Sequence, residues 1–156
     1  MTEQDAMRLA IEAARSGIAA GQSPFGAAIL RGGEVVAVAH NTVWRDGDPT
    51  AHAEINAIRA ASRAVGGIDL SGTVLYSTCE PCPMCLAATH WAKIDRVVFG
   101  ARIADSASAG FGELAVDAAL LAKMGKSALV VQGGMLQAEA VVLFAEWKQG
   151  GGAKGY

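Results

Sequence analysis

All three cysteines of this chain lie in one short stretch, where Cys79, Cys82 and Cys85 follow one another at intervals of three residues. The stretch comes after the run 73–77, which we expect to be a strand, and leads into a segment of helical character. Cysteines crowded so closely make a poor disulfide framework, whereas thiols in a reducing compartment stay free to bind a metal ion or to react. We therefore expect the three thiols to lie close together where a strand ends and a helix begins.

The spacing of Cys82 and Cys85 suits a single metal ion. Residues three apart lie on the same side of a helix, so both sulfur atoms can approach one ion from the first helical turn. The positive end of a helix favours the thiolate, which is the form that a metal binds. Cys79 precedes this turn, and we expect it to be a small buried thiol packed beside the strand end rather than a fourth ligand.

A second segment, 50–54, places His52 and Glu54 at the start of another predicted helix. A neutral imidazole would add a third ligand, and three protein ligands plus water describe a catalytic zinc site with one open position. Two thiolates neutralise Zn²⁺, so a nearby base helps to remove a proton from the water that the metal activates. Glu54 can take that proton and pass it to a substrate nitrogen. Taken alone, Glu54 is also an ordinary first-turn acid favoured by the helix dipole.

The rest of the chain alternates predicted helices and strands. Segments 25–30 and 34–39 flank Arg31-Gly32-Gly33, the pattern of a β-hairpin. The other expected elements are helices over 3–20, 51–65, 82–92, 114–123 and 136–147 and strands over 73–77, 96–99 and 128–131. Thr50 is the expected N-cap of the second helix, and Asp105 is expected in a loop. This order predicts an α/β fold, a three-layer α/β/α sandwich with helices on both faces of a mixed sheet of about five strands.

Size and charge limit the class of protein. With 156 residues, 52% of them hydrophobic, we expect one domain over 1–156. The net charge of −2 and the lack of a basic cluster argue against nucleic acid as a partner. Charged residues scattered through 1–20 are atypical of a signal peptide or a membrane span, so we expect a cytoplasmic protein without a membrane partner.

The two motifs together resemble a known family. His-Ala-Glu at 52–54 followed by Pro-Cys-Pro-Met-Cys at 81–85 is similar to the H-x-E…P-C-x-x-C signature of zinc-dependent nucleobase deaminases, the cytidine and deoxycytidylate deaminase superfamily. The resemblance implies a cytidine-deaminase-like fold and one zinc ion per chain. It also implies that His52, Cys82 and Cys85 bind the zinc and that Glu54 moves protons.

Within this superfamily the chain most resembles the bacterial guanine deaminases. The stretch 109–113, Ala-Gly-Phe-Gly-Glu, is similar to their Gly-Phe-Asp followed by an acid, although Gly112 stands where they have Asp. By this resemblance Glu113 grips the edge of the substrate and assists proton transfer. Tyr156 resembles a tyrosine that closes over the active site of the same or a partner chain, so 148–156 is expected to be a flexible or site-closing tail. A homodimer, with or without exchanged C-terminal segments, is also implied.

A purine is flat and apolar above and below its plane, so its pocket needs aromatic faces and hydrogen bonds at the edge. Phe25 and Trp91 are candidates for the faces, and Asn41 and Glu113 for the edge. Each has a plainer interpretation: the two aromatic residues as core, Asn41 as a turn former and Glu113 as an acid at a helix start. Tyr156, close behind several glycines, is equally typical of a disordered terminus.

We expect hydrolytic deamination of a free purine base, guanine to xanthine and ammonia, with water attacking C2 and Glu54 protonating N3. The alternatives are deamination of tRNA adenosine to inosine, which shares the metal motifs, and deamination of cytosine or of a triazine such as ammeline. A zinc-stabilised binding module is the non-enzymatic alternative, in which Glu54 would have no task.

Overall fold

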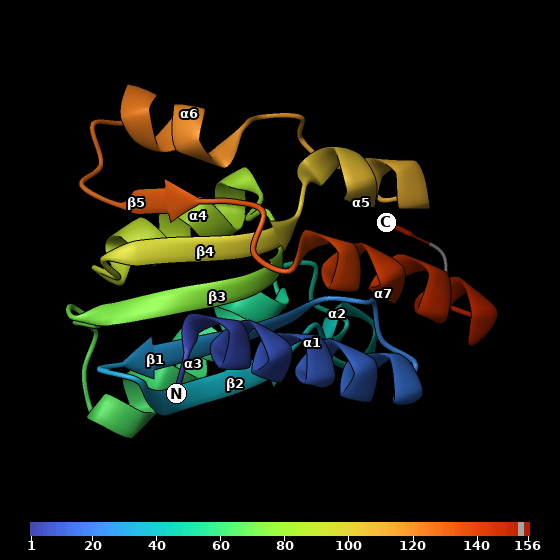
Figure 1. The fold of residues 1–156 in the computed structure, drawn as a ribbon, viewed down its shortest axis with the longest axis horizontal. Coiled ribbons are helices and arrows are strands. Elements are labelled where there is room, and N and C mark those ends of the chain that lie inside the picture. Colours follow the sequence, from blue (N-terminus) through green and yellow to red (C-terminus); the bar gives the residue numbers. More distant parts are fainter. Residues whose placement is uncertain (153–154) are drawn as a thin grey trace.

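A five-stranded mixed sheet forms the centre of the computed structural model, which describes residues 1–152 and 155–156 (Figure 1). The strands are β1 (Gly26–Arg31), β2 (Glu34–His40), β3 (Thr73–Cys79), β4 (Arg96–Ala101) and β5 (Val130–Gln132), in the order β2-β1-β3-β4-β5. β1 runs antiparallel to both β2 and β3, whereas β3, β4 and β5 are parallel. The predicted fold is confirmed.

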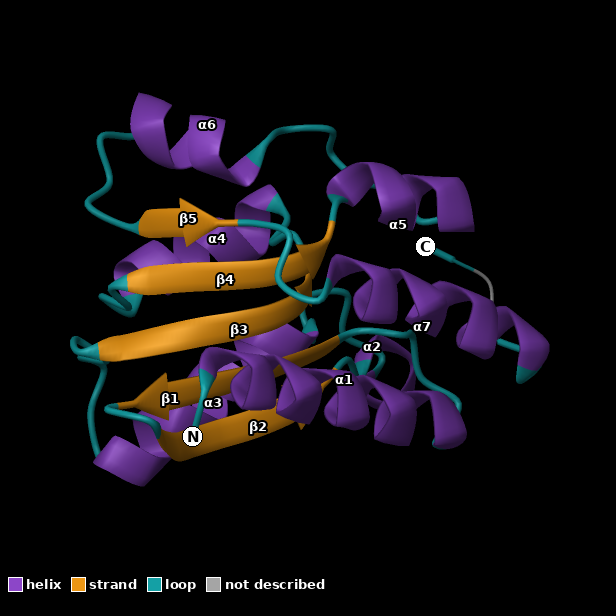
Figure 2. Cartoon of the chain, viewed as in Figure 1, coloured by secondary structure: helices purple, strands orange, loops and turns teal. Residues whose placement is uncertain are grey.

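Helices cover both faces of this sheet (Figure 2). One face carries α1 (Glu3–Ala19) and α7 (Gln137–Gln149), and the other carries α3 (Ala53–Val65), α4 (Pro83–Trp91) and α6 (Ala118–Met124). Two short helices, α2 (Val43–Asp46) and α5 (Ile103–Ala109), follow β2 and β4. α7 includes the start of the expected tail 148–156, of which 153–154 lie outside the described residues. Within the described part, no helix has the length and apolar character needed to cross a membrane.

The two apolar layers follow the alternation of side chains along β1. Ala27 and Ile29 pack in the layer of α3, α4 and α6, whereas Ala28 and Leu30 pack against α1. At Gly26 the helix α1 approaches so closely that an added Cβ would collide with its backbone. Glycine at the first position of β1 is therefore required for α1 to lie directly on the sheet.

Four chain segments meet at one edge of the sheet because of the strand directions. The parallel strands β3 and β4 both end at this edge, and they lead into α4 and α5. The antiparallel pairings Gly26 with His40 and Ala27 with Ser77 bring the start of β1 and the end of β2 to the same edge. The segments that carry most of the predicted site residues are thus brought together by the topology.

The helix α3 begins two residues later than expected. Its first residue is Ala53 and its N-cap position is held by His52, not by Thr50. The hydroxyl and main-chain N–H of Thr50 instead both donate to the Asp48 carboxylate, at 2.7 and 2.8 Å. This local turn competes with helix capping, and it leaves the imidazole at the helix end.

Two other segments differ from expectation through capping acids. The helix predicted from Leu114 begins at Ala118, where the side chain of Asp117 accepts a hydrogen bond from within the first turn. The segment that carries Asp105 is helix α5 and not a loop. Its first turn is closed by the Asp105 carboxylate, which accepts the main-chain N–H of Arg102 at 2.8 Å.

Candidate active site

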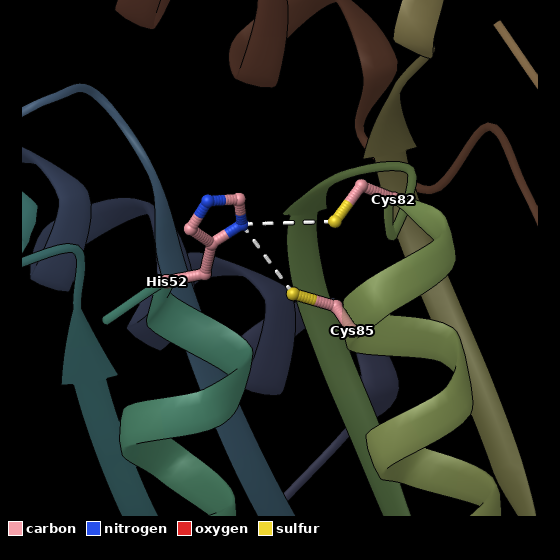
Figure 3. Close-up of side chains that lie close together, drawn as sticks. All are labelled: His52, Cys82 and Cys85. Carbon is pink, nitrogen blue, oxygen red and sulfur yellow. Dashed lines mark hydrogen bonds between the residues drawn. The ribbon is translucent and has the colours of Figure 1, made fainter. Parts of the chain in front are cut away.

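His52, Cys82 and Cys85 point toward one another at the N-terminal ends of α3 and α4 (Figure 3). The Nδ1 atom of His52 lies 3.7 Å from Sγ of Cys82 and 3.5 Å from Sγ of Cys85. His52 and Cys82 occupy the N-cap positions of their helices, so the positive helix ends favour the thiolate form. Pro83 follows at the first helical position, where a missing N–H leaves no donor unpaired.

The spacing of these atoms fits a tetrahedral zinc ion. Zinc binds thiolate sulfur at about 2.3 Å and imidazole nitrogen at about 2.0–2.1 Å, which places neighbouring nitrogen and sulfur ligands about 3.6 Å apart. The two nitrogen–sulfur distances of 3.7 and 3.5 Å lie on either side of that value. Three protein ligands leave one corner of the tetrahedron for water or substrate.

The three thiols have different environments. A hydrogen bond from Cys85 lowers the pKa of Cys82 to about 4, so a thiolate forms readily at this position. Burial raises the pKa of Cys79 well above its ordinary value, and its Sγ lies 3.6 Å from the carbonyl oxygen of Arg102. Cys79 is thus a buried neutral thiol outside the metal-ligand cluster.

Glu54 lies in the first turn of α3, two residues after His52, and is 6% exposed. The hydroxyl of Ser77 donates to its Oε1 atom at 3.2 Å. Burial raises the pKa of the Glu54 carboxyl above its ordinary value. A carboxyl with a raised pKa beside the ligand cluster is suited to accept a proton and to return it.

A cavity of about 250 Å³ opens beside the ligand cluster. Six of the residues predicted from the sequence line it: Phe25, His52, Glu54, Cys82, Glu113 and Tyr156. These residues come from the start of β1, the N-terminal ends of α3 and α4, the segment after α5 and the end of the chain. The cavity lining therefore combines the metal-ligating residues with residues that other segments supply.

Aromatic rings also line the cavity. The rings of Phe25 and Phe111 meet edge to face with centroids 4.8 Å apart, and Phe111 also lies 5.7 Å from the ring of Tyr156. Phe111 was not predicted as a site residue, although its neighbour Glu113 was. The Oε1 atom of Glu113 accepts a hydrogen bond from Ser106 at 2.8 Å, and burial raises the pKa of this carboxyl.

Tyr156 is held over the cavity by residues of its own chain. Its hydroxyl accepts a hydrogen bond from the side-chain amide of Asn41 at 2.7 Å, and its carbonyl oxygen accepts the main-chain N–H of Gly112 at 2.8 Å. Burial raises the pKa of Tyr156 to about 12, so the phenol stays neutral. The other side-chain atom of Asn41, Oδ1, accepts the N–H of Val43 at 3.1 Å. Asn41, predicted at the substrate edge, here engages Tyr156 and the backbone.

Trp91 lies away from the cavity, contrary to the expectation that it supplies an aromatic face. It ends α4, whose opposite end carries Cys85, and it is 79% exposed. The nine residues of α4 place its two ends about 12 Å apart. Phe111, and not Trp91, lines the cavity beside Phe25.

Known proteins are similar to this chain in sequence and in fold. Residues 1–101 match the family model of the cytidine and deoxycytidylate deaminase zinc-binding region. A guanine deaminase of Bacillus subtilis is 44% identical over 108 residues, which are 69% of this chain and 67% of that protein. A tRNA-specific adenosine deaminase of Aquifex aeolicus is 41% identical over 95 residues, which are 61% of this chain and 63% of that protein. A structure of guanine deaminase from Nitrosomonas europaea is 28% identical with a TM-score of 0.86, covering 95% of this chain and 85% of that one.

Proposed function

The chain belongs to the cytidine and deoxycytidylate deaminase family and carries its zinc-binding region, and we propose that it hydrolyses guanine to xanthine and ammonia. The observation that carries the choice of substrate class is the cavity beside the zinc ligands, which measures about 250 Å³ and has Tyr156 among its lining residues. Sites for drug-sized ligands measure roughly 300–1,000 Å³, so this cavity suits a single base.

The residues of the site divide the reaction between them. His52, Cys82 and Cys85 would hold the zinc ion, which when bound supplies a Lewis acid that lowers the pKa of a water molecule. Glu54 takes a proton from the water that adds to C2 of guanine and delivers it to N3. Glu54 then moves the proton of the hydroxyl group on C2 to the amino nitrogen, the bond between C2 and that nitrogen breaks, and the nitrogen leaves as ammonia while C2 keeps the oxygen as a carbonyl.

Glu113 accounts for the choice of guanine among the purines. Guanine presents two kinds of N–H donor beside C2, at N1 and at the amino group itself, whereas adenine has no N–H at N1. An ionised carboxylate only accepts hydrogen bonds, and charge-assisted bonds to it are stronger than neutral ones. Among the described residues, the hydroxyl of Ser106 engages only Oε1 of Glu113, so Oε2 is available to the base. Phe25 and Phe111 would pack beside the ring.

Two features support a free base over a base within RNA. Tyr156 lines the cavity and is tethered to Gly112 and Asn41, so it narrows the space that a base attached to a polynucleotide would need. The cavity also contains the carboxylates of Glu54 and Glu113, and the chain has a net charge of −2, whereas RNA-binding sites neutralise phosphates with lysine and arginine.

A panel of substrates tests the proposal. Ammonia release would be measured from guanine, cytosine, adenosine, ammeline and a tRNA stem-loop that contains the target adenosine, with Glu54→Gln protein as the control for contaminating enzymes. We expect guanine to have the highest kcat/KM. Faster deamination of the stem-loop than of any free base would replace guanine by tRNA adenosine. A zinc-loaded protein that releases no ammonia from the panel would instead point to a binding module.

A further inference from the structure

Glu80 is a buried carboxylate to which the proposed chemistry gives no role. It lies on the turn between β3 and α4, two residues before Cys82, and is 6% exposed. We call this turn the metal-binding turn. Both of its oxygens accept main-chain N–H groups: Oε2 from Ile103 at 3.2 Å and Oε1 from Ala118 at 2.9 Å. Its own main-chain N–H donates to the carbonyl oxygen of Ala101 at 2.8 Å. One side chain thus connects the metal-binding turn to two separate parts of the chain.

The two main-chain donors whose hydrogen bonds Glu80 accepts, Ile103 and Ala118, lie at the start of α5 and directly after the segment 110–117. Ile103 is the first residue of α5 and Ala118 the first residue of α6, and the segment joins these helices. The segment carries Glu113, whose carboxylate is held from α5 by the hydroxyl of Ser106. The position of Glu113 relative to the metal ligands therefore depends on how α5 and α6 are attached to the metal-binding turn.

We propose that Glu80 is a positioning residue, which ties the metal-binding turn to the starts of α5 and α6 and thereby sets the place of Glu113. The predicted effect of Glu80 on guanine turnover rests on the proposed function. Its predicted effect on the position of the segment 110–117 does not. A carboxylate suits this task because both of its oxygens accept and neither donates.

Glutamine at this position has one acceptor oxygen and one NH₂ group. The NH₂ group would face a main-chain N–H, so at least one of the two buried donors, Ile103 or Ala118, would lose its partner. Aspartate keeps the charge and both oxygens but is one methylene shorter, so it should not reach the two donors at the same time. The variants Glu80→Gln and Glu80→Asp therefore test the connection in two different ways.

The first experiment needs no substrate. Zinc content and amide hydrogen exchange, followed by NMR, would be compared between the parent and Glu80→Gln. We expect about one zinc per chain in both proteins, and exchange at Ile103 or Ala118 at least about tenfold faster in the variant. If Glu80→Gln does not fold, the same measurement is made on Glu80→Asp. Parental exchange rates at both amides would overturn the proposal.

The second experiment measures kcat/KM for guanine in a double-mutant cycle. A small misplacement of a substrate-binding group can lower the rate by up to about 10²-fold, so we expect Glu80→Gln to lose roughly 10- to 100-fold. In the Glu113→Gln background, Glu80→Gln should lower kcat/KM by less than about threefold, because the group that Glu80 positions is already altered. Equal losses in both backgrounds, or no loss in the parent background, would show that Glu80 does not act through Glu113.

Asp117→Ala provides the matched control. Asp117 also accepts a main-chain N–H at the start of α6, that of Leu120 at 2.8 Å, and the hydrogen bond that its carboxylate accepts thus comes from within α6. Its removal should leave kcat/KM within about twofold of the parent. If Asp117→Ala lowers kcat/KM as much as Glu80→Gln does, then Glu80 only stabilises a helix and is not a positioning residue. Failure of the parent to turn over any base would refute the proposed function, and the exchange experiment would still decide the role of Glu80 in holding the segment.

Discussion

Replacing Glu54 by glutamine tests the proposed proton transfer with little change to the structure. Glutamine keeps the length of the side chain and one carbonyl oxygen, so the hydroxyl of Ser77, which now lies 3.2 Å from Oε1, keeps its acceptor. Glu54 is 6% exposed, and a neutral amide there needs no ionised group to be desolvated. We expect a free energy of unfolding within about 1 kcal/mol of the parent, with about one zinc still bound per chain.

The expected loss of rate follows from what the amide cannot do. It has no titration near neutral pH, so the acid–base contribution, worth about 10²–10⁴-fold in rate, disappears altogether. Glu54 is proposed to accept a proton and then deliver it, and both steps fail in the variant. We therefore expect kcat to fall on the order of 10³-fold, equivalent to about 4 kcal/mol in the barrier. KM should change little, because Glu113 and the aromatic rings hold the base.

The assay is ammonia release at saturating guanine, with zinc content measured on the same samples. Ser77→Ala is the matched control, because it removes the hydrogen bond to the carboxylate but leaves the base in place. We expect that control to stay within about tenfold of the parent, the value of one hydrogen bond. A fully zinc-loaded Glu54→Gln protein with kcat within about fivefold of the parent would refute the proton-transfer role.

Three further predictions concern the cysteines and the predicted pocket residues. Cys79→Ala should keep about one zinc per chain while Cys82→Ala loses it, by metal analysis; loss of zinc in the Cys79 variant would contradict the three-ligand cluster. Trp91→Ala should leave kcat/KM for guanine within about twofold of the parent, since the side chain is exposed and lies away from the cavity. A tenfold loss of kcat/KM would show that Trp91 contributes to the site. Tyr156→Phe removes the hydroxyl that accepts from Asn41 at 2.7 Å, and an unpaired buried donor costs about 1–3 kcal/mol. We expect KM to rise about tenfold or more in steady-state assays; an unchanged KM would show that this contact does not close the cavity.

The metal site was predictable from the sequence because its geometry is local. Cys82 and Cys85 are spaced to share the first turn of one helix, and His52 starts another, so the positions within each helix follow from the helical repeat alone. The strands and their order of alternation with helices followed from apolar periodicity in the same way. Glu113 and Tyr156 were predicted only through resemblance to a family, since neither spacing nor composition places them beside the metal ligands.

The residues missed or misplaced depend on tertiary contacts. Trp91 was expected at the pocket because it is aromatic and follows the cysteines, but six residues along a helix carry it away from Cys85. Phe111 was overlooked because an aromatic residue between two glycines reads as part of a loop. Its place beside the cavity depends on tertiary contacts, with its ring centroid 4.8 Å from that of Phe25 and 5.0 Å from that of Trp147. The homodimer implied by the resemblance stays a prediction.

The pairing of β1 with β3 has a consequence for the order in which the protein matures. The helix ends that carry His52 and Cys82 are joined through β3, whose Ser77 pairs with Ala27 far back in the chain. Contacts between residues so distant in sequence form slowly, and the ligands are not neighbours until that pairing exists. Zinc should therefore bind after the sheet has formed and should not start its folding. The rate of zinc loading should depend on zinc concentration. The refolding rate, followed by stopped-flow fluorescence, should not. A cell short of zinc would then accumulate folded protein without metal, which later zinc supply could load without new protein synthesis.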